Sequence, residues 1–264
     1  QMALQLNYFI SINMKAIITG ATGQKEIDLS APIGIHLSLQ HNQRLGAWYV
    51  APPSITPHRE GDFIGSIEAG APVNFNDISF NPHAHGTHTE CVGHILSGDY
   101  KVLNALKKNF FETLLITVAP ELIQGDLQIT KSQLIAAIGD HQVPESLVIR
   151  TLPNNATKIS QQYSHSNPPY LSQETATYIR ELGVQHLLVD LPSIDKEEDQ
   201  GALKAHKAFW NVGESIRLEA TITEFLYVPN TVLDGPYLLQ IGLAPFVNDA
   251  TPSTVFLYEF KNTL

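Results

Sequence analysis

Four histidines and one glutamate fall within the twelve residues from His83 to His94, and this cluster constrains the fold more than any other feature of the chain. Zinc and similar divalent ions are bound by imidazole nitrogens and carboxylate oxygens that converge from a short, stiff segment. His88 and Glu90 are two residues apart, so an extended backbone places both side chains on one face. Gly93 permits a turn that returns His94 to the same place. The segment therefore predicts a metal centre; the alternative is a solvent-exposed, histidine-rich loop.

The residues between these histidines have predicted supporting roles. Gly86 is expected to allow a close backbone approach or a positive φ angle. Thr87 is expected to orient a ligand or to donate to a substrate oxygen. Cys91 is the only cysteine, which excludes an intrachain disulfide. We expect Cys91 to be a small buried residue rather than a ligand or nucleophile, because no activating partner can be assigned to it.

Composition limits the class of protein. The chain has 264 residues, 43% of them hydrophobic and 16% charged, which suits one globular domain. Its net charge of −10 argues against nucleic acid and against anionic membranes, because both need clustered Lys and Arg. The mildly apolar stretch from Leu4 to Ile12 contains polar residues, and Lys15 follows it rather than precedes it, so we do not expect a secretory signal. The expected location is cytoplasmic, and the expected partner is a small-molecule substrate.

The hydrophobic pattern predicts a mixture of strands and helices. Apolar runs rich in β-branched residues predict strands, and apolar positions at helical spacing between capping residues and glycines predict helices. Strands are expected over 15–19, 45–50, 111–118, 147–151, 186–191, 237–243 and 254–260, and helices over 132–138, 173–182 and 202–210. Residues 51–82 are rich in Pro, Gly, Asn and Asp and are expected to form a loop. The strand–helix–strand order over 147–191 is typical of an α/β fold.

The histidine cluster also resembles the signature of a known family. Gly86-Thr87-His88, Glu90 and His94 match the pattern H-x-G-T-H-x-D-x-P-x-H of the cyclase family of metal-dependent hydrolases, which includes bacterial kynurenine formamidase (an arylformamidase) and isatin hydrolase. Further stretches agree with the family in the same order: Ile27-Asp28-Leu29-Ser30, Leu147-Val148-Ile149-Arg150-Thr151, Gly183-Val184 to Asp195, Ala205-His206, and Thr223-Glu224-Phe225-Leu226. The resemblance extends over about residues 26 to 260.

The resemblance implies a fold, a cofactor and a set of site residues. The fold is an α/β, swivelling β/β/α-type single domain over 26–264, preceded by an N-terminal extension and first strand over 1–25. The implied cofactor is one or two divalent ions, Zn2+ or Mn2+, and the implied assembly is a homodimer or homotetramer. His88 and Glu90 are the matching ligands, and His94, His206 and Glu224 complete a second metal site or serve as acid–base groups.

The sequence departs from the family pattern at several positions. The family's first histidine falls by strict spacing on Ala84, so either His83 or His85 takes its place. Glu90 replaces an aspartate and Cys91-Val92 an Ala-Pro pair, and the stretch from His206 to Glu224 is longer than in the formamidases. These differences bear on the substrate more than on the chemistry.

We therefore expect a metal-dependent hydrolase of an amide, a formamide, or a cyclic amide or ester, which acts on C–N bonds other than peptide bonds. His206 or Glu224 is expected to pass a proton to the leaving group. Candidate aromatic residues for holding a planar substrate are Trp48, Tyr49, Phe63 and Phe80. The alternatives are a metal-dependent lyase or cyclising enzyme and a non-catalytic metal- or ligand-binding protein. A serine hydrolase is not favoured, because the sequence has no G-x-S-x-G motif.

Overall fold

Seven strands close on themselves to form a barrel in this computed structural model, which describes residues 14–20 and 23–261. The stretch from Leu4 to Ile12 lies outside the described residues. In order around the barrel the strands are β8 (His88–Glu90), β15 (Thr221–Glu224), β14 (His186–Val189), β12 (Ser146–Thr151), β9 (Phe110–Val118), β16 (Gly235–Leu243) and β17 (Ala250–Lys261). The pairs β9–β12, β12–β14 and β14–β15 are parallel. The other pairs around the barrel, including the pair of β17 with β8 that closes it, are antiparallel. The predicted single-domain α/β fold is confirmed.

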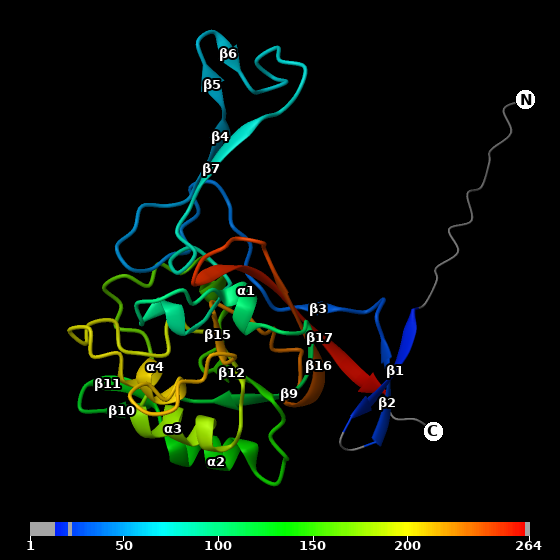
Figure 1. Cartoon of the computed structure of the whole chain (residues 1–264), viewed down its shortest axis with the longest axis vertical. Coiled ribbons are helices and arrows are strands. Elements are labelled where there is room, and N and C mark those ends of the chain that lie inside the picture. The colour runs from blue at the N-terminus through cyan, green and yellow to red at the C-terminus, as the bar shows by residue number, and fades with distance from the viewer. Residues whose placement is uncertain (1–13, 21–22, 262–264) are drawn as a thin grey trace, which may run out of the picture.

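The central strands are buried on both faces, which explains their continuous apolar runs. Leu114 and Ile116 of β9 pack with the helices α2 (Lys131–Ile138), α3 (Gln173–Glu181) and α4 (Lys204–Phe209). Leu115, between them, points to the opposite face and joins a second cluster with Val148 and Leu188, enclosed by β16 and β17. The helices thus cover one side of the barrel (Figure 1).

The helices begin and end at residues that suit those positions. Thr130 and Gln133 form a capping box at the start of α2. The Ser172 hydroxyl accepts a hydrogen bond from the Thr175 N–H at the start of α3. Gly183, with φ of +85°, follows the end of α3, as expected for a helix stop.

Two β-structures project from the barrel (Figure 1). The hairpin of β1 (Lys15–Gly20) and β2 (Gly23–Asp28) pairs with the end of β17, which also pairs with β3 (Ile33–Gly34). The predicted domain boundary between residues 25 and 26 therefore falls inside β2. The other projection, which we call the arm (residues 54–79), consists of β4 (Ser54–Pro57) paired with β7 (Asn76–Ser79) and β5 (Arg59–Glu60) paired with β6 (Phe63–Ile64).

The remaining elements are short. They are β10 (Glu121–Ile123), β11 (Asp126–Ile129), β13 (Tyr170–Leu171), α1 (Val102–Ala105), and the 3-10 helices η1 (Val92–His94) and η2 (Ala156–Ser160). The predicted strand over 45–50 is wrong, because only Gly46 forms a bridge and both Trp48 and Tyr49 have a left-handed φ of 60° that an extended strand cannot contain. Among the described residues, no helix is long and apolar enough to cross a membrane.

Candidate metal centre

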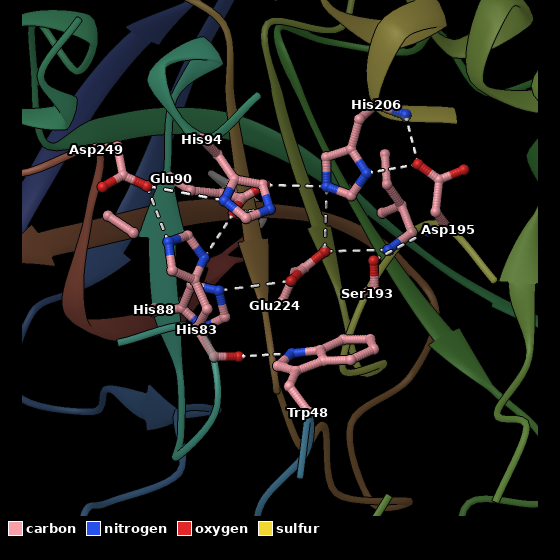
Figure 2. A network of polar contacts seen from close by, with 12 residues as sticks. Trp48, His83, His88, Glu90, His94, Ser193, Asp195, His206, Glu224 and Asp249 are labelled. Carbon is pink, nitrogen blue, oxygen red and sulfur yellow. Dashed lines mark hydrogen bonds and ion pairs between the residues drawn. The ribbon is translucent and has the colours of Figure 1, made fainter. Parts of the chain in front are cut away.

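Histidine and carboxylate side chains from six separate segments meet in one cluster that could hold a metal (Figure 2). Strand β8 supplies His88 and Glu90, and its antiparallel register places Glu224 of β15 directly opposite His88. Helix α4 supplies His206, and η1 supplies His94. The turn before β8 supplies His83, and the connection between β16 and β17 supplies Asp249.

Within residues 14–20 and 23–261, three overlapping groups of residues have ligand atoms close enough to share a metal ion. Within each group the ligand atoms all lie within 4.8 Å of one another. The groups are His83, His94 and Asp249; His83, His88 and Glu90; and Glu90, His94 and His206. Glu90, His83 and His94 each belong to two of the groups, and Glu90 is the fully buried member that contacts His83, His94 and His206.

The state of the Glu90 and His88 side chains fits a cation. Glu90 is fully buried, and its Oε2 makes no hydrogen bond although it lies 3.0 Å from His83 Nδ1 and 3.8 Å from His94 Nε2. His88 Nε2 is likewise buried without a hydrogen bond, 3.5 Å from Glu224 Oε2. Buried polar atoms are nearly always hydrogen-bonded, since leaving them unpaired is costly. Imidazole nitrogens and carboxylate oxygens that converge, with some of these buried atoms left without a hydrogen bond, are what a Zn2+ or Mn2+ ion requires.

His206 is held between carboxylates. Its Nδ1 lies 2.6 Å from Asp195 Oδ2, and its Nε2 lies 3.1 Å from Glu90 Oε1 and 3.9 Å from Glu224 Oε1. Asp195 also accepts hydrogen bonds from the backbone N–H groups of Ala205 and His206, so it both orients the ring and caps the first turn of α4. Asp28 is not part of this network. Its carboxylate accepts a hydrogen bond from the Ser30 N–H and forms an ion pair with Lys261.

The carboxylates control the protonation of the cluster. Burial lowers the pKa of His83, but the Asp249 and Glu90 carboxylates outweigh burial and raise the pKa to about 10. Burial also lowers the pKa of His206, but the Asp195 and Glu90 carboxylates outweigh burial and raise this pKa to about 10. Burial raises the pKa of Glu90, but the neighbouring histidines hold it well below its usual value. In the metal-free protein, protons on imidazoles therefore supply positive charge that a divalent ion would otherwise provide.

The structure places His83, rather than His85, beside Glu90. His83 Nδ1 faces the Glu90 carboxylate. His85 accepts a hydrogen bond from the Asn81 N–H through Nδ1 and belongs to none of the three ligand groups found among the described residues. Burial also lowers the pKa of His85. Of the two histidines that the sequence leaves open, His83 is the one positioned for a metal.

Several predicted supporting residues have structural roles. The Thr87 hydroxyl donates to the Phe225 carbonyl and accepts from the Leu37 N–H, so it ties backbone segments together rather than facing a substrate. Gly86 allows its backbone to lie close to the Leu37 backbone, because a Cβ at this position would lie only 3.2 Å from the Leu37 carbonyl oxygen. Cys91 is buried beside Val102, as expected, and burial raises the pKa of its thiol.

The four candidate aromatic residues lie in different surroundings. Trp48 lies beside the site, where its Nε1–H donates to the His83 carbonyl over 3.0 Å (Figure 2). Tyr49 is exposed and donates to Glu197, and Phe63 is exposed on the arm. The Phe80 ring packs edge-on against Phe246 with centroids 5.9 Å apart. Trp48 is thus the candidate that contacts a site residue.

Asp249 is a site residue that no motif in the sequence indicates. Its Oδ2 lies 2.9 Å from His83 Nε2 and 3.8 Å from His94 Nδ1, and these contacts lower its pKa. In the sequence it is one polar residue in a turn region between two predicted strands. Only the closing pair of β17 with β8, in which Ala250 lies opposite Glu90, reveals that this turn borders the site.

Comparison with known proteins gives an independent assignment. The model of the Cyclase family matches residues 27–196, which include the histidine cluster and Asp195. No curated protein matches the chain at a significant level. Among solved structures, a protein described as a potential metal-dependent hydrolase with cyclase activity has a TM-score of 0.61 at 17% identity and covers 88% of this chain and 99% of its own.

Two further structures have the same fold. A predicted metal-dependent hydrolase from Bacillus stearothermophilus has a TM-score of 0.59 at 17% identity, over 86% of this chain and 98% of its own. Isatin hydrolase A from Labrenzia aggregata, bound to benzyl benzoate, has a TM-score of 0.62 at 13% identity, over 88% of this chain and 94% of its own. Because the family model matches well over half of the sequence, the chain belongs to the Cyclase family.

Proposed function

We propose that the protein is a metal-dependent hydrolase of a small amide, formamide or cyclic amide or ester. The observation that carries the proposal is the fully buried Glu90 carboxylate, with one oxygen free of hydrogen bonds and facing the rings of His83 and His94. The fold similarity to proteins described as metal-dependent hydrolases supports it. The ion would be held by His83, His88 and Glu90, with His206 and Glu224 on the inner side of Glu90.

A divalent ion held by these residues would supply Lewis acidity, which lowers the pKa of water and polarises a carbonyl oxygen. The chain's own residues supply orientation and proton transfer. His206 and Glu224 are buried, and the Ile194 N–H donates to Glu224 over 3.0 Å, so both side chains are held in fixed positions. His206 and Glu224 therefore form the inner wall of the site, and they are poorly placed to exchange protons with a departing product.

His94 is better placed for proton transfer to the leaving group. Its side chain is 31% exposed, whereas Glu90 beneath it is fully buried. Its ring stacks on His83 with centroids 4.2 Å apart, which keeps the ring at the mouth of the site. We therefore assign the acid–base role to His94, and this differs from the preference for His206 or Glu224 drawn from the sequence.

Cyclic amides of the isatin type and N-formylated aromatic amines are the first substrates to test. Isatin hydrolase is among the structures with this fold. Trp48 lies beside the His83 backbone and offers a flat face for a planar substrate. The long His206–Glu224 connection and the replacement of aspartate by Glu90 leave the choice within this class to experiment.

Hydrolysis of isatin and N-formylkynurenine should be followed with and without a chelator, in water labelled with 18O. The proposal predicts turnover that a chelator abolishes and zinc or manganese restores, with one labelled oxygen in the product. Turnover without label would instead favour the lyase or cyclising enzyme. Stoichiometric metal without turnover of any amide or cyclic ester would favour the non-catalytic binding protein, in which protein atoms close the coordination sphere.

A further inference from the structure

We infer that Asp249 is a positioning residue for the metal centre: it accepts the Nε2–H of His83 and thereby turns the Nδ1 lone pair of that ring toward the ion beside Glu90. The inference rests on the proposed metal-dependent function. It adds a residue that lies outside the segment matched by the family model, which ends at residue 196.

The two ring nitrogens of His83 face two different carboxylates. Nδ1 lies 3.0 Å from Glu90 Oε2 in the buried interior, and Nε2 lies 2.9 Å from Asp249 Oδ2 nearer the surface (Figure 2). A neutral imidazole carries a single N–H, and the acceptor at one nitrogen decides which nitrogen keeps it. With Asp249 as that acceptor, the nitrogen facing Glu90 is free to bind a metal.

The same arrangement occurs on the other side of Glu90. His206 Nδ1 lies 2.6 Å from Asp195, and His206 Nε2 lies 3.1 Å from Glu90. Each ring thus has an outer carboxylate on one nitrogen and the shared inner carboxylate on the other. Carboxylates that orient metal-binding histidines in this way fix the ring and make it a stronger ligand.

The backbone aims Asp249 at His83. Its carbonyl accepts a hydrogen bond from the Cys91 N–H over 3.0 Å, so Asp249 is tied to the segment that carries Glu90. Gly93 makes room for it, since a Cβ at Gly93 would lie 3.2 Å from the Asp249 Cβ. Among the described residues, the Asp249 carboxylate forms ion pairs with histidines and with no Lys or Arg. The charged partners of Asp249 in this part of the chain thus belong to the histidine cluster.

The alternative is that Asp249 is itself a ligand of a separate outer ion, together with His83 and His94. The contact of Asp249 with His94 Nδ1 is long, at 3.8 Å, whereas its contact with His83 Nε2 is at hydrogen-bond distance. The contact with His83 Nε2, at 2.9 Å, is the hydrogen bond that the positioning role requires. The two roles differ in the number of ions bound, which makes them separable.

Zn2+ affinity and stoichiometry should be measured for the full chain and for Asp249→Ala, Asp249→Asn and Asp99→Asn, by competition with a chromophoric chelator and by elemental analysis. Asp99 is an exposed control beside Lys101. We expect Asp249→Ala to keep the wild-type number of ions but to bind them about 10–100-fold more weakly. Asp249→Asn should lie between, because it keeps an acceptor oxygen, and Asp99→Asn should match wild type.

The visible spectrum of the Co2+-loaded protein gives a second readout. A change in Asp249→Ala, absent in Asp99→Asn, is expected because the ring orientation at the ion changes. Unchanged affinity and spectrum in Asp249→Ala would overturn the inference, and so would the loss of one whole ion per chain, which would make Asp249 a direct ligand. Failure of the wild-type chain to bind metal would instead refute the proposed function itself.

Discussion

His83 and His85 stand on either side of Ala84, and the two rings occupy different environments. We predict that His83→Gln weakens zinc binding more than 100-fold, because it removes a nitrogen 3.0 Å from the central carboxylate. His85→Gln should leave zinc affinity within a few-fold of wild type, since His85 contacts the Asn81 backbone instead. Chelator competition on both variants checks this. Equal losses in the two variants, with both folded by circular dichroism, would contradict the assignment of His83.

Metal binding should release protons. The pKa values of His83 and His206 are raised to about 10, so both rings are protonated at neutral pH in the metal-free protein. A ring must lose a proton before its nitrogen binds a metal, so we expect release of about two protons per chain at pH 7 to 8 and affinity that rises toward pH 10. Calorimetry in buffers of different ionisation enthalpy measures this number. Affinity that is independent of pH would contradict the raised values.

Most of the site could be predicted from single residues, and the rest depends on long-range pairing. His83, His88, Glu90 and His94 are close in sequence, and His206 and Glu224 are recognisable from the family pattern. Asp249 was not predictable, because its role requires β17 to close the barrel against β8. The choice between His83 and His85 also needed the backbone path of the turn, which no spacing rule supplies.

At the scale of one element, β14 carries a buried histidine that should make stability depend on pH. Burial, followed by the charges of Lys108 and Arg217, lowers the pKa of His186 from 6.5 to about 4. The unfolded chain therefore binds a proton more readily than the folded one. The corresponding stability is fully present above about pH 6.5 and is lost as the pH falls toward 4, by at most about 3 kcal/mol.

Urea denaturation between pH 7 and pH 4 tests this on wild type, His186→Gln and the exposed control His141→Gln. We expect His186→Gln to lose free energy of unfolding less steeply with falling pH than the other two proteins. His186→Gln also loses the packing of the His186 ring on Phe111, so the slope with pH, rather than the absolute stability, is the diagnostic. Parallel slopes in all three proteins would contradict the lowered pKa.

The elements differed in how well the sequence predicted them. β9 and β12 are buried on both faces, so their apolar runs were clear, and the caps at Thr130 and Ser172 marked the starts of α2 and α3. β8 and β15 have only three and four residues, and they carry the polar site residues, so local pattern alone could not show that they close a barrel. The arm was expected to be a loop because its short strands are separated by turn residues.

At the scale of the whole molecule, the arm carries several exposed apolar side chains. We propose that these side chains mediate association into a homodimer or homotetramer. An isolated two-stranded hairpin is marginally stable in water, and exposed apolar patches mark interaction surfaces. The exposed side chains are Phe63, Ile67, Val73, Phe75 and Ile78.

Light scattering after size-exclusion chromatography should show an oligomer for wild type and a shift toward monomer for the double variant Ile67→Ser/Ile78→Ser. Leu122→Ser removes an apolar side chain outside the arm that is more exposed than Ile67 or Ile78, and it should leave the mass unchanged. A monomeric wild-type protein, or an oligomer that the double variant leaves intact, would contradict this role of the arm.

The most direct test of the central claim is the metal content of untagged protein, measured by elemental analysis for wild type and for Glu90→Gln. We predict one or two equivalents of zinc or manganese per wild-type chain and a loss of bound metal in Glu90→Gln, because the buried Glu90 carboxylate contacts three of the histidines. A wild-type chain that binds no divalent metal, even after reconstitution, would contradict the claim that this histidine and carboxylate cluster is a metal centre.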